Sequence, residues 1–137
     1  MSTHSTPMKI LLVDDDELFL EFAAAMLSAD GATVETCASA AEAITALNLD
    51  DEGKPPRDFD AVLIDIVMPE VSGTELCSLI RGHAGYRDLP VLMISATRDM
   101  SLIDQALTAG GSSYIQKPIQ AATFADEIRR KIAVARG

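Results

Sequence analysis

The sequence predicts an α/β fold in which five parallel strands form a doubly wound sheet with helices on both faces. Three observations predict this fold class. Short apolar runs alternate with longer stretches of helical periodicity, the strongest runs end abruptly in Asp or Ser, and Asp-Gly or Gly-Gly follows two of the helical stretches. Strands without polar alternation are typical of a parallel sheet buried on both faces. The right-handed crossovers that join parallel strands then distribute the helices over both faces.

The predicted strands fall into a strong and a weak group. The strong group comprises three apolar runs that end at Asp14, Asp65 and Ser95, whereas the weak group mixes polar and apolar residues. All five runs are short, as is usual for strands of a small domain. In chain order, the predicted strands are 10–13, 33–37, 61–64, 90–94 and 112–116.

Helical periodicity follows each predicted strand. Residues that favour helix N-caps stand at the start of several of these stretches, among them Asp16, Ser72 and Asp99. Asp30-Gly31 and Gly110-Gly111 follow the first and the fourth stretch, where glycine commonly ends a helix. The predicted helices are 17–29, 40–49, 72–82, 99–109 and 121–135.

Length and composition indicate one globular domain. A chain of 137 residues that is 48% hydrophobic has room for a single core and not for a second folded unit. We predict a disordered amino-terminal tail at residues 1–8 and one domain at residues 9–137, with no effector domain after it. The polar stretch 49–58 is predicted to be a long loop within this domain, because strand-like sequence resumes directly after it.

The net charge narrows the classes of partner. At a net charge of −10 the chain would be repelled by nucleic acid and by anionic membranes, so we expect protein partners. The apolar run 10–13 is too short for a signal peptide or a membrane span. Cys37 and Cys77 form no redox or metal-binding pair and are predicted to be buried thiols, which suits a reducing compartment. We therefore predict a cytoplasmic location.

Polar side chains follow the predicted strands at their carboxyl ends, where open α/β sheets bind their ligands. Asp14 and Asp15 follow the first strand, Asp65 the third, Ser95 the fourth and Lys117 the fifth. Three ionised carboxylates and one ammonium give this cluster a formal charge of −2. One divalent cation would cancel that charge, and oxygen ligands favour Mg²⁺.

Four motifs occur in order on these strands. They are Leu12-Val13-Asp14-Asp15, Asp65-Ile66-Val67-Met68-Pro69 followed by Gly73, Ser95-Ala96, and Tyr114-Ile115-Gln116-Lys117-Pro118. With these motifs, the chain strongly resembles the CheY-like receiver domains of two-component response regulators over about residues 8–135. The resemblance implies a flavodoxin-like (βα)5 fold with the strand order 2-1-3-4-5.

The resemblance implies a role for each residue of the cluster. Asp65 would accept a phosphoryl group from a phosphohistidine, and the Ser95 hydroxyl and the Lys117 ammonium would bind the phosphoryl oxygens. Such a domain is not an enzyme with separate substrates, since it catalyses only its own phosphotransfer and dephosphorylation. The ligands of Mg²⁺ would be Asp14, Asp15, Asp65 and the backbone carbonyl of Val67.

The resemblance also implies a switch and a set of partners. Ser95 would move toward the phosphoryl group, and Tyr114 would turn inward and change the surface of the fourth helix, fifth strand and fifth helix. The expected partners are a sensor histidine kinase or histidine phosphotransfer protein, a downstream protein, and a second copy of this chain that binds only after phosphorylation. The Lys117-Pro118 peptide bond is predicted to be cis. A docking face for the kinase is predicted on the first helix at Leu18, Phe19 and Phe22.

Other functions fit parts of the sequence. A pseudo-receiver, which uses this fold for dimerisation or docking without phosphorylation, stays open as the alternative. A flavodoxin-type phosphate site is disfavoured because Asp14-Asp15-Asp16 would repel phosphate unless a metal intervenes. A phosphatase of the haloacid-dehalogenase type is disfavoured because Val67 stands where that class has a second acid. The apolar Val67 cannot orient a water molecule, so we also predict slow loss of the phosphoryl group.

Overall fold

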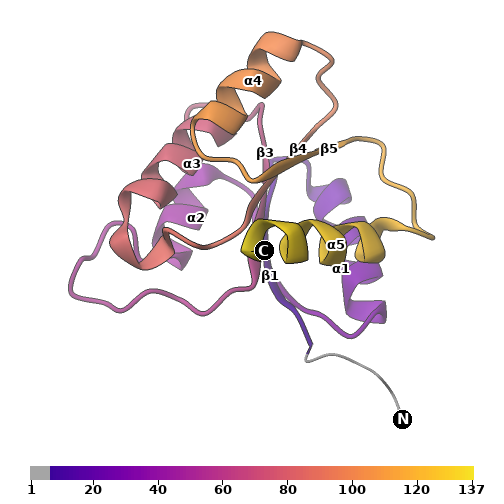
Figure 1. Cartoon of the computed structure of the whole chain (residues 1–137), viewed down its shortest axis with the longest axis horizontal. Helices are drawn as coiled ribbons and strands as arrows, with labels where there is room; N and C mark the ends of the chain where they lie inside the picture. Colours follow the sequence, from indigo (N-terminus) through magenta and orange to yellow (C-terminus); the bar gives the residue numbers. More distant parts are fainter. Residues whose placement is uncertain (1–6) are drawn as a thin grey trace.

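The computed structural model describes residues 7–137 as a parallel sheet of five strands between two layers of helices (Figure 1). The sheet order is β2-β1-β3-β4-β5, and each neighbouring pair of strands is parallel. The predicted fold class and strand order are therefore confirmed. The strands are β1 (Lys9–Val13), β2 (Thr33–Cys37), β3 (Ala61–Asp65), β4 (Val91–Ser95) and β5 (Ser113–Gln116).

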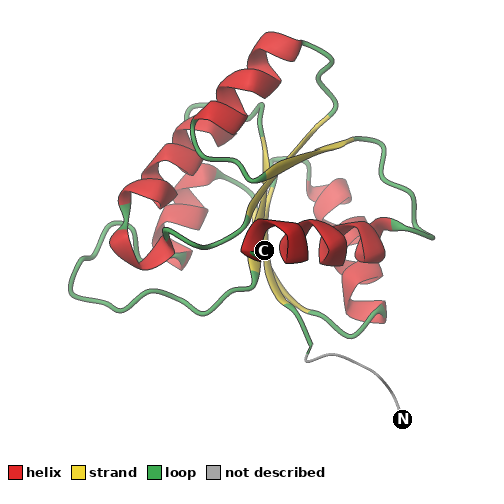
Figure 2. Ribbon diagram, in the orientation of Figure 1, coloured by secondary structure: helices red, strands yellow, loops and turns green. Residues whose placement is uncertain are grey.

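Helices cover both faces of the sheet (Figure 2). Along β1, Ile10 and Leu12 pack with α1 and α5 on one face, while Leu11 and Val13 pack with α2, α3 and α4 on the other. This two-sided burial explains why the central strands are apolar without alternation. None of the helices within residues 7–137 is long and apolar enough to cross a membrane. The helices are α1 (Glu17–Ala29), α2 (Ala40–Ala46), α3 (Gly73–Gly82), α4 (Met100–Thr108) and α5 (Phe124–Arg136).

The predicted N-caps are confirmed. The Asp16 carboxylate accepts hydrogen bonds from the backbone N–H groups of Leu18 and Phe19 at 3.1 and 3.2 Å and so starts α1. The side chains of Ser72 and Asp99 cap α3 and α4 in the same way. Each such cap contributes about 1 kcal/mol to helix stability, because it satisfies backbone donors that the helix leaves free.

Two helices differ from their predicted bounds by three residues at one end, because turns replace these ends. α2 stops at Ala46, since Asn48 adopts a left-handed φ of 58° that a helix cannot continue. α5 begins at Phe124, because residues 121–123 form a turn in which the Thr123 N–H donates to the Gln120 carbonyl at 3.1 Å.

The folded domain begins earlier than predicted. Met8, which the sequence analysis places in a disordered tail at residues 1–8, is buried against the core beneath α1 and α5. Its carbonyl accepts a hydrogen bond from the Thr33 N–H at 2.8 Å. Burial of this apolar side chain removes it from water and extends the ordered chain in front of β1. The assignment of Met8 was therefore wrong, whereas residues 1–6 lie outside the described part of the chain.

Tyr86 fastens the long loop at residues 49–58. It belongs to a short 3-10 helix, η1 (Ala84–Tyr86), which the sequence analysis did not predict. Its buried hydroxyl donates to the Leu47 carbonyl at 2.7 Å and accepts from the Arg57 N–H at 2.7 Å. Because this loop leads into β3, it lies at the amino ends of the strands, away from the carboxyl ends.

Candidate functional site

Three carboxylates meet at the carboxyl ends of β1 and β3. Asp14, Asp15 and Asp65 each place one oxygen so that all three oxygens lie within 4.8 Å of one another. The sheet register explains this proximity, because Val13 of β1 pairs with Ile64 of β3 and the residue that follows each of them is an aspartate. The predicted convergence of these side chains is found in the structure.

Asp14 is the most buried member of the cluster. Only 1% of its surface is exposed, and its N–H donates to the Cys37 carbonyl at 3.1 Å. Its Oδ1 accepts a hydrogen bond from the Asp16 N–H at 2.9 Å. Asp15 is exposed, so of the three consecutive aspartates the first is buried, the second faces solvent and the third caps α1.

Lys117 brings a positive charge into the cluster. Its Nζ lies 2.6 Å from Asp14 Oδ2 and 3.5 Å from Asp65 Oδ2. Its backbone N–H donates to the Ser95 carbonyl at 2.9 Å, and the Lys117-Pro118 peptide bond is cis as predicted. Burial lowers the pKa of Lys117, but the hydrogen bond to Asp14 and the charges of both carboxylates outweigh burial and raise the pKa above its ordinary value. The ammonium is therefore charged at neutral pH.

Asp65 ends β3 in a buried position. Its Oδ1 accepts a hydrogen bond from the Val67 N–H at 3.2 Å, and its surface is 7% exposed. Burial and, to a smaller extent, the charge of Asp14 together raise the pKa of Asp65 from 3.8 to about 6, against the opposing effects of Lys117, Val67 and Ser95. The ionised form of Asp65 is thus costly without an additional positive charge.

We expect the pKa of Asp65 to make metal-free stability depend on pH. Between about pH 4 and 6 the folded protein keeps a proton that the unfolded chain releases, so the contribution of Asp65 to the free energy of unfolding falls as pH rises. The loss is at most about 3 kcal/mol. Urea unfolding in EDTA across this interval should show Asp65→Asn gaining stability relative to the wild type. Parallel pH curves for the two proteins would contradict this expectation.

Ser95 and Tyr114 lie together beside the cluster. Ser95 ends β4 next to Asp65, is 2% exposed, and accepts a hydrogen bond from the Thr97 N–H at 3.2 Å. The Tyr114 hydroxyl lies 3.1 Å from the Ser95 carbonyl and 3.1 Å from the Thr97 carbonyl. The Tyr114 side chain of β5 therefore contacts the end of β4 at Ser95 and the loop that connects β4 to α4.

The donor set fits a divalent cation. Its three carboxylates carry only oxygen ligands, and together with Lys117 the cluster has a formal charge of −2. Hard oxygen ligands with room for further ligands suit Mg²⁺. Val67 lies two residues after Asp65, in the loop that follows β3, and its carbonyl oxygen stays a predicted ligand.

Asp15→Asn is expected to weaken Mg²⁺ binding at least about tenfold, since even outer-shell changes commonly cost that much. The fold should persist with unchanged or higher thermal stability, because Asp15 is exposed and its charge repels its neighbours. Titration calorimetry and thermal melting measure the two effects. Asp16→Asn is the matched control, since asparagine caps a helix as well as aspartate and should keep the affinity. Unfolding of Asp15→Asn would make Asp15 structural instead.

Gly73 allows α3 to start directly behind Asp65. Its N–H donates to the Ile66 carbonyl at 2.9 Å. A β-carbon at this position would lie 2.0 Å from the Asp65 carbonyl oxygen and 2.8 Å from its carbonyl carbon. Only glycine fits this approach, so the first turn of α3 supports the backbone that presents Asp65.

Two contacts of the site are absent from the predictions made from the sequence. The centroid of the Phe19 ring lies 4.2 Å from Lys117 Nζ, whereas the predicted role of Phe19 is only that of a docking-face residue. The Gln116 carboxamide donates to the Ala96 carbonyl at 3.3 Å and lies 3.1 Å from the Tyr114 hydroxyl. No local pattern in the sequence signals the contacts of Phe19 with Lys117 and of Gln116 with Ala96, because they join residues far apart in the chain.

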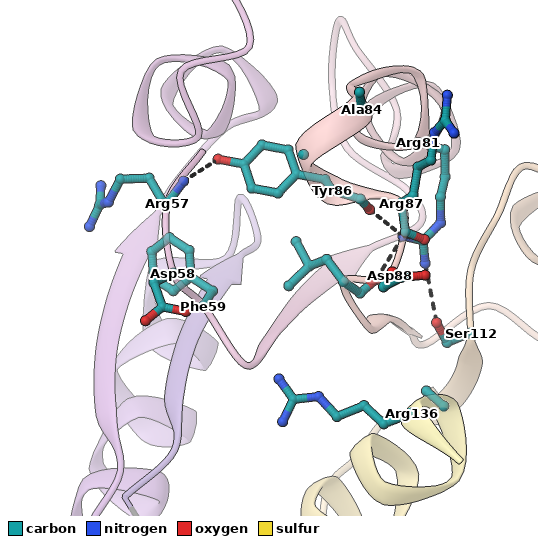
Figure 3. Close-up of a pocket in the computed structure, with 13 residues that line it drawn as sticks. Arg57, Asp58, Phe59, Arg81, Ala84, Tyr86, Arg87, Asp88, Ser112 and Arg136 are labelled. Atoms are coloured by element: carbon teal, nitrogen blue, oxygen red, sulfur yellow. Dashed lines mark hydrogen bonds between the residues drawn. The ribbon is translucent and has the colours of Figure 1, made fainter. Parts of the chain in front are cut away.

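A hollow lies at the amino ends of the strands, away from the acidic cluster (Figure 3). It has a volume of about 690 Å³ and is lined by four arginines, Arg57, Arg81, Arg87 and Arg136. Formal charge does not accumulate there, because Asp58 and Asp88 also line it while Glu35 and Asp60 form ion pairs with two of the arginines. Arg81 donates to the carbonyls of Gly110, Tyr86 and Leu89 and to Ser112 Oγ. Arg81 thus connects the segments that precede β4 and β5 at the amino ends of these strands.

The sequence matches the response regulator receiver domain family over residues 10–129. The chain belongs to this family. The match extends from β1 into α5 and includes every residue of the acidic cluster. This receiver domain is therefore a signalling domain of the two-component type, as the motifs imply.

Curated relatives carry this domain within longer chains. The receiver domain is 32% identical to the protein RcaC of Microchaete diplosiphon, covering 92% of this chain and 18% of that protein. It is 36% identical to response regulator MprA of Mycobacterium sp. strain KMS, covering 82% of this chain and 45% of that protein. The chain thus spans less than half the length of these relatives.

Solved receiver structures have the same fold. A CheY-like receiver domain protein from Methanospirillum hungatei is 27% identical, with a TM-score of 0.78 over 95% of this chain and 97% of that chain. The receiver domain of a sensor histidine kinase from Pseudomonas aeruginosa is 25% identical, with a TM-score of 0.79 over 93% of this chain and 99% of that chain. A magnesium ion is coordinated in the active-site cleft of the Pseudomonas domain.

Proposed function

We propose that Asp65 accepts a phosphoryl group from a phosphohistidine of a sensor histidine kinase or histidine phosphotransfer protein. The observation that carries this proposal is the position of Asp65, whose carboxylate lies among two further carboxylates and the Lys117 ammonium. Phosphoryl transfer needs mainly positioning and neutralisation of charge, and this arrangement supplies both.

In the proposed reaction, an Asp65 carboxylate oxygen forms a bond to phosphorus as the phosphorus–nitrogen bond to the imidazole breaks. The imidazole leaves with the electron pair of that bond and takes up a proton. Lys117 and the Ser95 hydroxyl bind oxygens of the transferred group, while the Val67 N–H holds Asp65 Oδ1 in place. Mg²⁺, held by Asp14, Asp15, Asp65 and the Val67 carbonyl, would neutralise charge on the phosphoryl oxygens when bound.

The proposed output is a change of the surface formed by α4, β5 and α5. Ser95 would move toward the phosphoryl group, and the loop that connects β4 to α4, which Tyr114 contacts, would move with it. The Tyr114 hydroxyl, now 3.1 Å from the Ser95 and Thr97 carbonyls, would lose these partners and the ring would turn inward. A downstream protein or a second phosphorylated copy of the chain would bind the altered surface.

The phosphodonor is proposed to dock on α1. Leu18 and Phe22 are 78% and 49% exposed there, and α1 begins directly after the acidic cluster. Exposed apolar side chains beside a charged site are typical of protein-binding surfaces. We place this exchange in the cytoplasm and, on the strength of the net charge of −10, without nucleic acid or membrane as partners.

A pseudo-receiver is the alternative function. It would need the fold but not the acidic cluster, and burying the carboxylates of Asp14 and Asp65 costs free energy that a docking module has no reason to spend. The raised pKa of Asp65 is a sign of that cost. The cluster therefore favours phosphorylation over simple docking.

Intact-mass measurement after incubation with acetyl phosphate or phosphoramidate and Mg²⁺ tests the proposed function. One added phosphoryl group is expected, and EDTA should prevent its addition. Absence of the adduct in the wild type, with folding verified by circular dichroism, would favour the pseudo-receiver.

Val67→Asn is expected to shorten the lifetime of the phosphorylated protein severalfold. Val67 is 53% exposed, so an amide fits without disturbing the core and can orient water toward phosphorus. The decay of the adduct after removal of the donor measures the lifetime. Val67→Ala, which adds no hydrogen-bonding group, should leave it unchanged. An equal or longer lifetime in Val67→Asn would rule out this explanation of slow loss.

A further inference from the structure

We propose that Phe19 is a positioning residue that holds the Lys117 ammonium beside Asp65 through a cation–π contact. The inference rests on the proposed function, because it assigns a task in the same phosphoryl transfer. Its evidence is the geometry of three side chains around one nitrogen atom.

The Lys117 ammonium has one aromatic and two carboxylate neighbours. Nζ lies 4.2 Å from the centroid of the Phe19 ring, 2.6 Å from Asp14 Oδ2 and 3.5 Å from Asp65 Oδ2. A cation over an aromatic face within about 6 Å is attracted by the ring quadrupole, and the attraction grows when the cation is partly desolvated. The Lys117 side chain is 15% exposed, so this contact is largely shielded from water.

The ring differs from the carboxylates in one respect that matters for the reaction. Asp14 and Asp65 both belong to the cluster that fits a divalent cation, so a metal ion would compete with Lys117 for their oxygens. A phenyl ring is no ligand for a hard cation. Phe19 therefore keeps the flexible lysine at the site when its carboxylate partners are shared.

The third aspartate of the sequence fixes the position of this ring. Asp16 Oδ1 accepts a hydrogen bond from the Phe19 N–H at 3.2 Å, within the cap that starts α1. The partly buried Phe19 side chain also packs against the core beneath α1 and α5. The ring is thus held from both its backbone and its side chain, as a positioning residue requires.

A rate measurement tests the proposed role. With acetyl phosphate and Mg²⁺, Phe19→Leu should slow adduct formation roughly 3- to 30-fold, and Phe19→Tyr should restore most of the rate. Met26→Ala is the control, because Met26 is another partly buried α1 residue packed against the same core and should leave the rate unchanged. In a Lys117→Ala background, Phe19→Leu should have no further effect, since the ring then has no ammonium to hold. Equal slowing with and without Lys117 would reduce Phe19 to a packing residue.

A second measurement is independent of phosphorylation. In NMR spectra of the unphosphorylated protein, the ring current of Phe19 should shift the ε-methylene protons of Lys117 upfield of those of Lys54 and Lys131. The shift should persist on addition of Mg²⁺ and disappear in Phe19→Leu. Unshifted protons, or loss of the shift when Mg²⁺ is added, would overturn the inference. If the Lys117→Ala variants react too slowly for their rates to be compared, the NMR result is the deciding one. A wild type that shows the shift but takes up no phosphoryl group would instead refute the proposed function.

Discussion

Asp65→Asn is expected to abolish phosphoryl uptake from acetyl phosphate and phosphoramidate, leaving an intact mass without adduct. The carboxamide lacks the anionic oxygen that attacks phosphorus, so the loss should be complete. The amide oxygen can still accept the Val67 N–H, now 3.2 Å from Asp65 Oδ1, so the local backbone should stay in place. Mass spectrometry gives the uptake, and circular dichroism gives the state of the fold.

Asp60→Asn provides the matched control for this loss. Asp60 precedes the same strand at its opposite end, where it accepts a hydrogen bond from the Lys9 N–H at 2.7 Å and pairs with Arg136 at 3.1 Å. Its replacement should leave phosphoryl uptake intact. An adduct of undiminished yield on Asp65→Asn would show that another side chain is the acceptor.

Gly73→Ala is expected to cause the largest loss of stability among these variants, about 3 kcal/mol or more. The added β-carbon would lie 2.0 Å from the Asp65 carbonyl oxygen and 2.9 Å from Ile64 Cγ2. Neither neighbour can yield easily, because one is backbone and the other belongs to the fully buried β3. Urea unfolding measures the loss, and a lower rate of phosphoryl uptake should accompany it since Asp65 must shift.

Gly82→Ala separates this clash from a general effect of glycine. Gly82 is the last residue of the same helix, and a β-carbon there would meet no atom within 4 Å. Alanine should therefore be neutral or stabilising by up to about 1 kcal/mol. Comparable losses in both variants would mean that the close approach at Gly73 is not the cause.

The fold was predictable because its signals are local. The apolar runs that became β1, β3 and β4 report burial on both faces, and the caps at Asp16, Ser72 and Asp99 mark where helices begin. The errors are local as well. A left-handed Asn48 ended α2 early, and the burial of Met8 drew part of the predicted tail into the core.

The site was predictable wherever topology alone brings residues together. Asp14 follows β1, and Asp65 and Ser95 end the neighbouring strands β3 and β4, so parallel pairing places them side by side without detailed packing. The position of Phe19 over Lys117 depends on the rotation of α1 and on two side-chain conformations. Such contacts between residues far apart in the chain follow from the packed core, which no spacing in the sequence reveals.

The contacts of β4 and β5 differ between their two ends. At the amino end, Ser112 Oγ accepts hydrogen bonds from the Val91 N–H and from Arg81, whose guanidinium also donates to four backbone carbonyls. At the carboxyl end, side-chain contacts from Tyr114 and Gln116 hold the loop that follows Ser95. β4 and β5 are therefore held more firmly at their amino ends than at their carboxyl ends. Local opening and fast amide exchange should concentrate at the carboxyl ends, beside Asp65.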